Sequence, residues 1–232
     1  VYTYFIAPKY GAVMRDWRGW LLVVAGAIAG VFYANFIFDV ILPGAHDWST
    51  VVSKLATTGS DQAQLQRVTD VVSGALVLSL LPFVAAALPV RSWLGRIALW
   101  STAIFAIGTA IAGAVPLPSG EGAGAEVQQW VHNAASIGSL AAIFVGALAM
   151  ALDARDHGPR WVRSAAWLTF WFGGVVGSIL FGGFTVIAPF SWQVGVSQRF
   201  QIVVGSLWLV CLAIFAAMDG LGPRTRPKSK RG

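Results

Sequence analysis

Long runs of apolar residues with few charges repeat along the whole chain, and short polar segments separate them. Each run is close to the roughly 20 residues that a helix needs to cross the hydrocarbon core of a bilayer. The pattern predicts six spans, at residues 20–42, 68–90, 93–115, 127–152, 162–188 and 200–218. We therefore predict an all-α fold, a polytopic membrane helical bundle with six transmembrane helices.

The polar segments between these runs indicate how the helices connect. Arg91 and Ser92 alone separate the second run from the third, and Pro89 ends the earlier helix because its ring cannot continue the hydrogen-bond ladder. Residues 43–67 have mixed polarity, which we interpret as a short interfacial helix and a loop. Residues 1–222 then form one transmembrane domain, and residues 223–232 form a basic tail.

The composition agrees with this interpretation and leaves no room for a separate soluble domain. Of the 232 residues, 56% are hydrophobic and 11% are charged, whereas roughly 25% are charged in a typical soluble domain. Cys211 is the only cysteine, which excludes an intramolecular disulfide and a thiolate cluster.

The basic residues predict the orientation, because lysine and arginine in short loops stay on the cytoplasmic side. Only Lys54, Arg67 and Arg199 fall on the predicted outer side. The others share the opposite side: Lys9, Arg15, Arg18, Arg91, Arg96, Arg155, Arg160, Arg163, Arg224, Arg226, Lys228, Lys230 and Arg231. With six spans, both termini are then cytoplasmic, and we expect a prokaryotic cytoplasmic (inner) membrane.

The net charge of +6 raises the question of the partner. The basic residues lie in loops and in the tail beside apolar helices, so we expect membrane lipids rather than nucleic acid. The basic tail would bind anionic headgroups, at about 1 kcal/mol for each basic side chain. A protein partner or a homo-oligomer stays open.

Polar side chains concentrate at the outer ends of four predicted spans. Such groups are costly in hydrocarbon and must face one another, water or headgroups. We therefore predict an outward-facing polar pocket between these helices. Its candidate ligand-binding residues are Asn35, Asp39, Arg67, Asp70, Ser73, Glu126, Gln129, His132, Asn133, Gln198 and Arg199.

The residue types suggest what the pocket holds. We expect a lipid headgroup or a small polar molecule, with Arg67 and Arg199 binding an anionic group and with Asp39, Asp70 and His132 forming hydrogen bonds or exchanging protons. No metal site is expected, because catalytic zinc usually takes three protein ligands and only His132 of the three histidines lies in a span. Two facing histidines for haem are absent too, so no cofactor is expected.

Three other functions stay open. In a structural or assembly subunit, the polar groups would fix the register of the helices. In a lipid-modifying enzyme, His132 would act as a general base with Asp39 or Asp70 as its acidic partner. A transporter would carry polar groups past the middle of the membrane, and the sequence has few there. The sequence favours binding over catalysis.

Three short motifs carry a family resemblance. They are Val115-Pro116-Leu117-Pro118, Val131-His132-Asn133-Ala134-Ala135, and Ser197-Gln198-Arg199-Phe200 with the later Leu207-Trp208-Leu209. With them the chain resembles the six-span prokaryotic membrane proteins called domain of unknown function 998 (DUF998). Those proteins often have Phe-Pro followed by Asp after the third span, where this chain has Leu117-Pro118 and Glu121. The family is distantly similar to Frag1/DRAM/Sfk1-type proteins, which implies a link to lipid handling.

Overall fold

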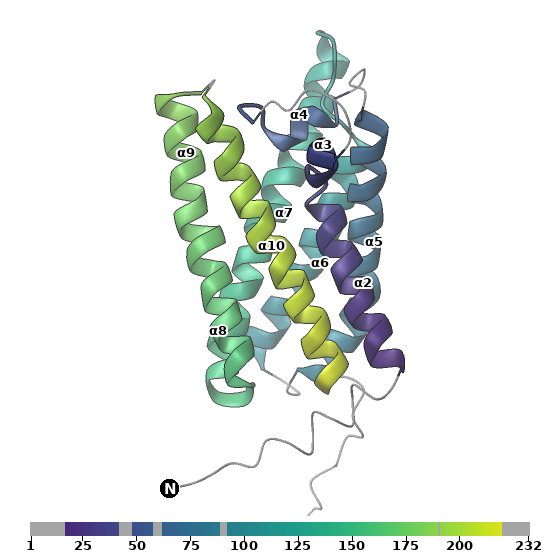
Figure 1. The fold of residues 1–232 in the computed structure, drawn as a ribbon, viewed down its shortest axis with the longest axis vertical. Coiled ribbons are helices and arrows are strands. Elements are labelled where there is room, and N and C mark those ends of the chain that lie inside the picture. The colour runs from purple at the N-terminus through teal and green to yellow at the C-terminus, as the bar shows by residue number, and fades with distance from the viewer. Residues whose placement is uncertain (1–16, 42–47, 58–61, 89–91, 190, 220–232) are drawn as a thin grey trace, which may run out of the picture.

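The computed structural model describes residues 17–41, 48–57, 62–88, 92–189 and 191–219. Its regular elements over these ranges are all helices (Figure 1). In chain order they are α2 (Trp17–Tyr33), α3 (Ile37–Ile41), α4 (Val52–Leu55), α5 (Ala63–Ala87), α6 (Trp93–Ala114), α7 (Ala123–His157), α8 (Arg160–Leu168), the π-helix η1 (Thr169–Val176), α9 (Gly177–Ile187) and α10 (Trp192–Asp219).

Five of these helical segments are long and apolar enough to cross a membrane: α5, α6, α7, the continuous α8–η1–α9, and α10. The sixth apolar helix, α2, is shorter, with 17 residues. The predicted fold class, an all-α polytopic membrane bundle, is confirmed for the described residues.

The helices lie side by side, with α6 between α5 and α7, and with α10 against α2 and α5 (Figure 1). Glycines let several of them approach closely. A Cβ atom on Gly26 would overlap the side chain of Ala213 in α10, and one on Gly108 would come within 2.8 Å of Ser139 in α7. Close backbone approach of this kind is a main source of helix association in membranes. Lipid tails are as apolar as the side chains, so there is no hydrophobic driving force between the helices.

The first predicted span, 20–42, is interrupted in the structure. Helix α2 ends at Tyr33, a turn covers residues 34–36, and α3 begins at Ile37. In the turn, the Ile37 N–H donates to the Ala34 carbonyl at 2.9 Å and the Phe38 N–H to the Asn35 carbonyl at 3.0 Å. Non-helical backbone at membrane depth persists where protein groups surround it, and Asn35 is buried here.

The fifth span, α8–η1–α9, contains eight residues of π-helix. Gln201 of α10 donates from its amide nitrogen to the Gly173 carbonyl at 3.1 Å and to the Ser178 hydroxyl at 3.0 Å. This span lies at the edge of the bundle beside α10 (Figure 1), and Ile179, Val186 and Ile187 are largely exposed. It is the least enclosed of the long spans.

The two ends of the bundle differ in their basic residues. The end that carries α4, called here the α4 end, also holds the first turns of α5 and α10 with Arg67 and Arg199. At the opposite end lie the described arginines Arg18, Arg96, Arg155, Arg160 and Arg163. The other basic positions used to predict the orientation lie outside the described residues, and so do Pro89 and the predicted tail. These basic positions are Lys9, Arg15, Arg91 and those within residues 223–232.

Candidate functional site

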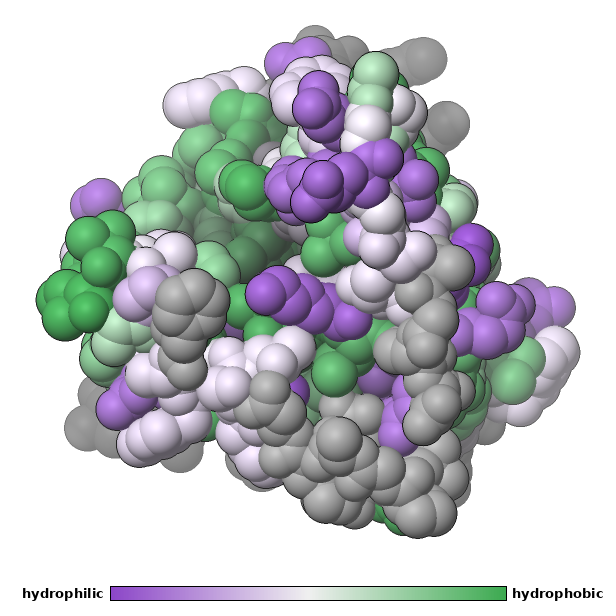
Figure 2. All heavy atoms as spheres, turned by 90° about the horizontal axis from the view of Figure 1, so that it is seen from above, coloured by the Kyte–Doolittle hydropathy of each residue, from purple (hydrophilic) through white to green (hydrophobic). Residues whose placement is uncertain are grey.

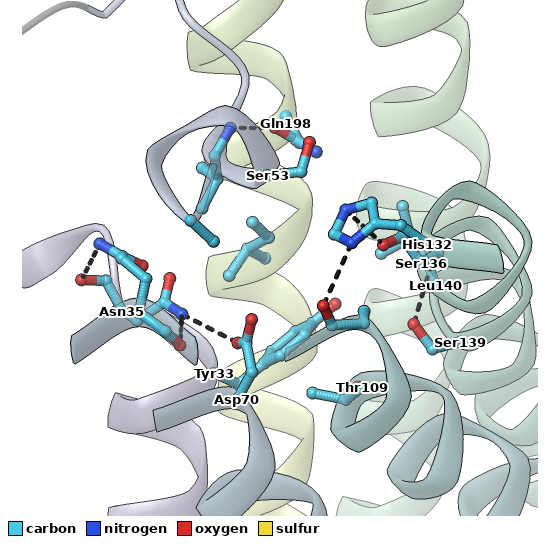
Figure 3. A pocket seen from close by; sticks show the side chains of 15 residues that line it. Tyr33, Asn35, Ser53, Asp70, Thr109, His132, Ser136, Ser139, Leu140 and Gln198 are labelled. Carbon is cyan, nitrogen blue, oxygen red and sulfur yellow. Dashed lines mark hydrogen bonds between the residues drawn. The ribbon is translucent and has the colours of Figure 1, made fainter. Parts of the chain in front are cut away.

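A cavity of about 80 Å³ lies beneath α4, between the adjoining ends of the helices (Figure 3). Liquid water takes about 30 Å³ per molecule, so the space suits a few waters or a small polar group. Seen from the α4 end, hydrophilic side chains gather among hydrophobic ones (Figure 2). The lining residues are Tyr33, Asn35, Val52, Ser53, Ala56, Gln66, Asp70, Thr109, Ala112, His132, Ser136, Ser139, Leu140, Gln198 and Ile202.

Asn35, Gln66 and Asp70 form one hydrogen-bonded group between the α2–α3 turn and α5. The Asn35 amide nitrogen donates to the Asp70 carboxylate at 2.8 Å and to the Gln66 carbonyl at 3.2 Å. The Gln66 amide nitrogen donates back to the Asn35 carbonyl at 3.3 Å. The bonds fix both amide orientations, because a flipped amide would set oxygen against oxygen.

The oxygens of the same two amides have no donor. Asn35 Oδ1 and Gln66 Oε1 are buried and have no hydrogen-bond partner among the described residues. Buried polar atoms are nearly always paired, so each exception calls for an explanation. Both residues line the cavity, and their unpaired oxygens are buried in its wall.

Thr109 adds a third buried polar atom without a described partner, its hydroxyl. A threonine within a helix commonly donates to the carbonyl four residues earlier. Thr102, two turns away in α6, does so, with its hydroxyl 2.8 Å from the Ala98 carbonyl. Thr109 lines the cavity and lacks that bond, so the two threonines differ in what their hydroxyls can offer.

His132 lies across the cavity from Asp70, on α7 (Figure 3). Its Nδ1 is 2.8 Å from the Val115 carbonyl and 3.1 Å from the Ala112 carbonyl, at the end of α6. Carbonyls only accept, so Nδ1 carries the proton of the neutral ring and Nε2 accepts from the Ser136 hydroxyl at 3.3 Å. His132 thereby caps the free carbonyls at the end of α6.

The turn at residues 48–50 and helix α4 cover the cavity and are called here the lid. The Val52 N–H donates to the Gln198 side-chain oxygen at 2.6 Å, and Arg199 donates to the Thr50 carbonyl at 2.9 Å. The Arg199 guanidinium also lies 5.1 Å from the centre of the Trp48 ring, a cation–π contact. A Cβ atom on Gly195 would overlap the Trp48 carbonyl, so the lid rests on the backbone of α10.

The structure brings four predicted ligand-binding residues together around the cavity: Asn35, Asp70, His132 and Gln198. Arg199 lies beside it and binds the lid. The Asp39 side chain lies outside the described residues.

The other predicted site residues point elsewhere. Ser73 donates to the Ala29 carbonyl at 2.8 Å and joins two helices. Arg67 donates from Nε to the Gly113 carbonyl at 3.3 Å and lines a separate groove between α5 and α6. Glu126 and Gln129 are exposed on the first turns of α7, and Asn133 is exposed although the adjacent His132 is buried.

Several lining residues were not among the predicted ones, and Gln66 is the most informative. The sequence analysis placed it in a loop, but α5 begins at Ala63 and carries it inward. Extending the predicted helix back by one turn would have shown Gln66, Asp70 and Ser73 on one face, at spacings of four and three residues.

The comparisons with known proteins extend this description. The DUF998 family model, described as a protein of unknown function, matches residues 23–214. No curated protein and no solved structure matches the chain. The matched range includes every residue that lines the cavity. Because it also covers most of the 232 residues, the chain belongs to the DUF998 family.

Proposed function

We propose that this membrane protein binds a lipid headgroup or a small polar ligand in the cavity beneath the lid. We place it in a prokaryotic cytoplasmic membrane with both termini on the cytoplasmic side, so that the α4 end faces outward. The five described arginines at the opposite end support this orientation, because basic residues flank spans on the cytoplasmic side.

The carrying observation is the set of unpaired atoms around the cavity. Asn35, Gln66 and Thr109 are each at most 3% exposed, and each presents one polar atom without a described partner. An unpaired buried polar atom costs about 1–3 kcal/mol. Buried oxygens without a described partner occur elsewhere in the bundle as well, for example at Gln201, but three of them gather around this one cavity. A ligand that completes these bonds accounts for their arrangement.

The lid supports a site that binds and releases its ligand. It is a short segment that Gln198 and Arg199 bind through polar contacts, and its Val52 packs in a small apolar cluster with residues such as Phe36 and Ile202. The main apolar core is separate from this cluster and lies between the long helices, around Phe105, Ile143 and Trp208. Opening of the lid would therefore break the small cluster and leave the main core folded.

The test compares Thr109→Val with Thr102→Val by native mass spectrometry of the gently solubilised protein. Valine has the shape of threonine, and at Thr109 no described hydrogen bond is lost. Thr102→Val is the matched control, because it removes a hydroxyl from the same helix outside the cavity lining. We expect a discrete bound mass in wild type and in Thr102→Val, and its loss in Thr109→Val.

Two results would contradict the proposal. One is a wild-type protein that carries no discrete bound mass. The other is a bound mass that both threonine variants retain equally, which would place the ligand elsewhere.

A lipid-modifying enzyme is a second candidate, favoured by one observation. The Ser136 hydroxyl lies 3.3 Å from His132 Nε2, and backbone carbonyls hold the other ring nitrogen. This is the arrangement of a nucleophile beside a general base that a third group orients. Ser136→Ala would then keep the bound ligand and abolish its turnover, measured by mass spectrometry of lipids after incubation. Equal turnover in Ser136→Ala and wild type would exclude Ser136 as the nucleophile.

A further inference from the structure

One side of the cavity is lined by residues that carry hydrogen-bond acceptors, and two of these acceptors have no described donor. This acceptor cluster consists of Asn35 Oδ1, Gln66 Oε1 and the Asp70 carboxylate. The two amide nitrogens nearest to it are occupied, by Asp70 and by backbone carbonyls. The amide oxygens and an ionised carboxylate can only accept, so a complementary group must donate several hydrogen bonds.

The charge of the lining also favours a ligand that donates hydrogen bonds. Asp70 is the only Asp, Glu, Lys or Arg among the lining residues. The two nearby arginines lie outside the lining, where Arg67 donates to Gly113 and Arg199 to Thr50. A buried carboxylate is costly without a partner of opposite charge. One positive charge would balance Asp70.

We propose that the cavity binds a primary ammonium group. Such a group has three N–H donors, no acceptor and one positive charge. The acceptor cluster offers three partners, and the positive charge would favour the ionised form of the Asp70 carboxylate. Its carbon atoms would lie against Ala112, Leu140 and Ile202, which are apolar parts of the same lining. The inference rests on the proposed function, because it names the chemistry of the ligand in that cavity.

Other cations fit less well. Calcium and magnesium are bound through six or more oxygens, commonly with carboxylates, and no cluster of three His, Cys, Asp or Glu side chains occurs in the described part of the chain. A quaternary ammonium has no N–H to donate and is recognised by cages of aromatic rings. Tyr33 is the only aromatic residue in the lining.

An ammonium group can come from the headgroup of an aminophospholipid or from a free amine. The experiment uses delipidated protein in detergent and native mass spectrometry. Phosphatidylethanolamine is titrated against phosphatidylcholine with the same acyl chains, since the two headgroups differ in the methyl groups on nitrogen. Free ethanolamine and sodium chloride are tested separately, as protection against thermal unfolding.

The variant is Asp70→Asn, which removes the charge and keeps an oxygen that Asn35 can donate to. Glu126→Gln is the matched control, because it removes an exposed carboxylate at the same end of the bundle. We expect wild type and Glu126→Gln to prefer phosphatidylethanolamine by at least about tenfold, since a hydrogen bond to a charged group is worth that factor. Asp70→Asn should lose the preference.

The remaining outcomes separate the sources and the hypotheses. Protection by free ethanolamine that depends on Asp70 would identify a free amine, and binding of the lipid alone would identify the headgroup. Equal binding of the two lipids, or protection by sodium alone, would overturn the ammonium inference. If wild type still carried a different bound mass that Thr109→Val loses, the proposed function would stand without it. No bound mass in any arm would defeat both.

Discussion

The α4 end of the bundle and the opposite half fill the space between their helices in different ways. In the opposite half, apolar side chains such as Val84, Met150 and Phe215 are almost completely buried in one continuous core. At the α4 end, a cavity of about 80 Å³ separates polar side chains, three of which keep a polar atom without a described partner. The opposite half is packed with apolar side chains, whereas the α4 end combines a small apolar cluster with a polar cavity.

This difference separates stability from binding within one bundle. Protein interiors gain stability from close packing, and a polar cavity forgoes that gain. Binding sites commonly keep such costly features because ligand contacts require them. Substitutions in the packed half should therefore change stability alone, whereas substitutions at the α4 end should change what the protein holds.

The largest expected effect is that of Phe215→Ala in the packed half. Removing a buried phenylalanine ring leaves a void and typically costs about 3–5 kcal/mol. Thermal unfolding in detergent, followed by circular dichroism, should show the loss. The folded fraction should keep its bound ligand in native mass spectrometry, and a ligand lost together with stability would contradict the separation of the two halves.

The next largest effect is expected for Asn35→Ala at the α4 end. The substitution removes the side-chain amide that donates to the Asp70 carboxylate and to the Gln66 carbonyl. An acceptor left unpaired in the interior costs about 1–3 kcal/mol. Unlike Phe215→Ala, this variant should lose both stability and ligand. Ser73→Ala, which breaks one bond to Ala29 outside the cavity, is the control and should keep the ligand. An Asn35 variant that binds normally would exclude this residue from the site.

A smaller effect is expected for Gly195→Ala beneath the lid. The added methyl group would overlap the Trp48 carbonyl. Relieving such crowding costs about 1–3 kcal/mol, and we expect this cost to weaken the attachment of the lid to α10. The Val52 amide, which donates to Gln198, should exchange its hydrogen faster while amides in α6 and α7 stay protected. Unchanged exchange at Val52 would show that the lid does not rest on Gly195.

The smallest effect is expected for Gly182→Ala in α9. A Cβ atom there meets nothing within 4 Å, and alanine in a helix is favoured over glycine by about 0.5–1 kcal/mol. Stability should rise slightly and ligand binding should not change. A clear loss of stability would reveal that another chain covers this face in the solubilised protein.

The sequence predicted the long helices because each leaves an uninterrupted apolar run, and it predicted Asp70 and His132 because ionisable residues within such runs are conspicuous. The interruption at Asn35 and the π-helix at Thr169–Val176 were not predicted. Both accompany contacts with residues far away in the chain, Gln66 in one case and Gln201 in the other. Helix periodicity within one segment contains no information about such partners.

The polar lining was predicted in part, for a related reason. Thr109 has the same local setting as Thr102, an isolated threonine in an apolar helix, so nothing in the sequence distinguishes the threonine that lines the cavity. Glu126, Gln129 and Asn133 were predicted as site residues because they precede or open an apolar run. The hydropathy of that run does not reveal that α7 begins at Ala123, beyond the neighbouring helices.

The turn between α2 and α3 has a consequence for how a ligand loses its water. At about 1.5 Å per residue, the 17 described residues of α2 extend about 25 Å, less than the roughly 30 Å of a hydrocarbon core. If Trp17 lies at one boundary of the bilayer, Asn35 lies several ångströms short of the other. A group that reaches Asn35 must therefore shed part of its hydration shell. A headgroup drawn in from the neighbouring leaflet would travel a shorter path than a solute arriving from bulk water, and dehydration becomes part of the selectivity.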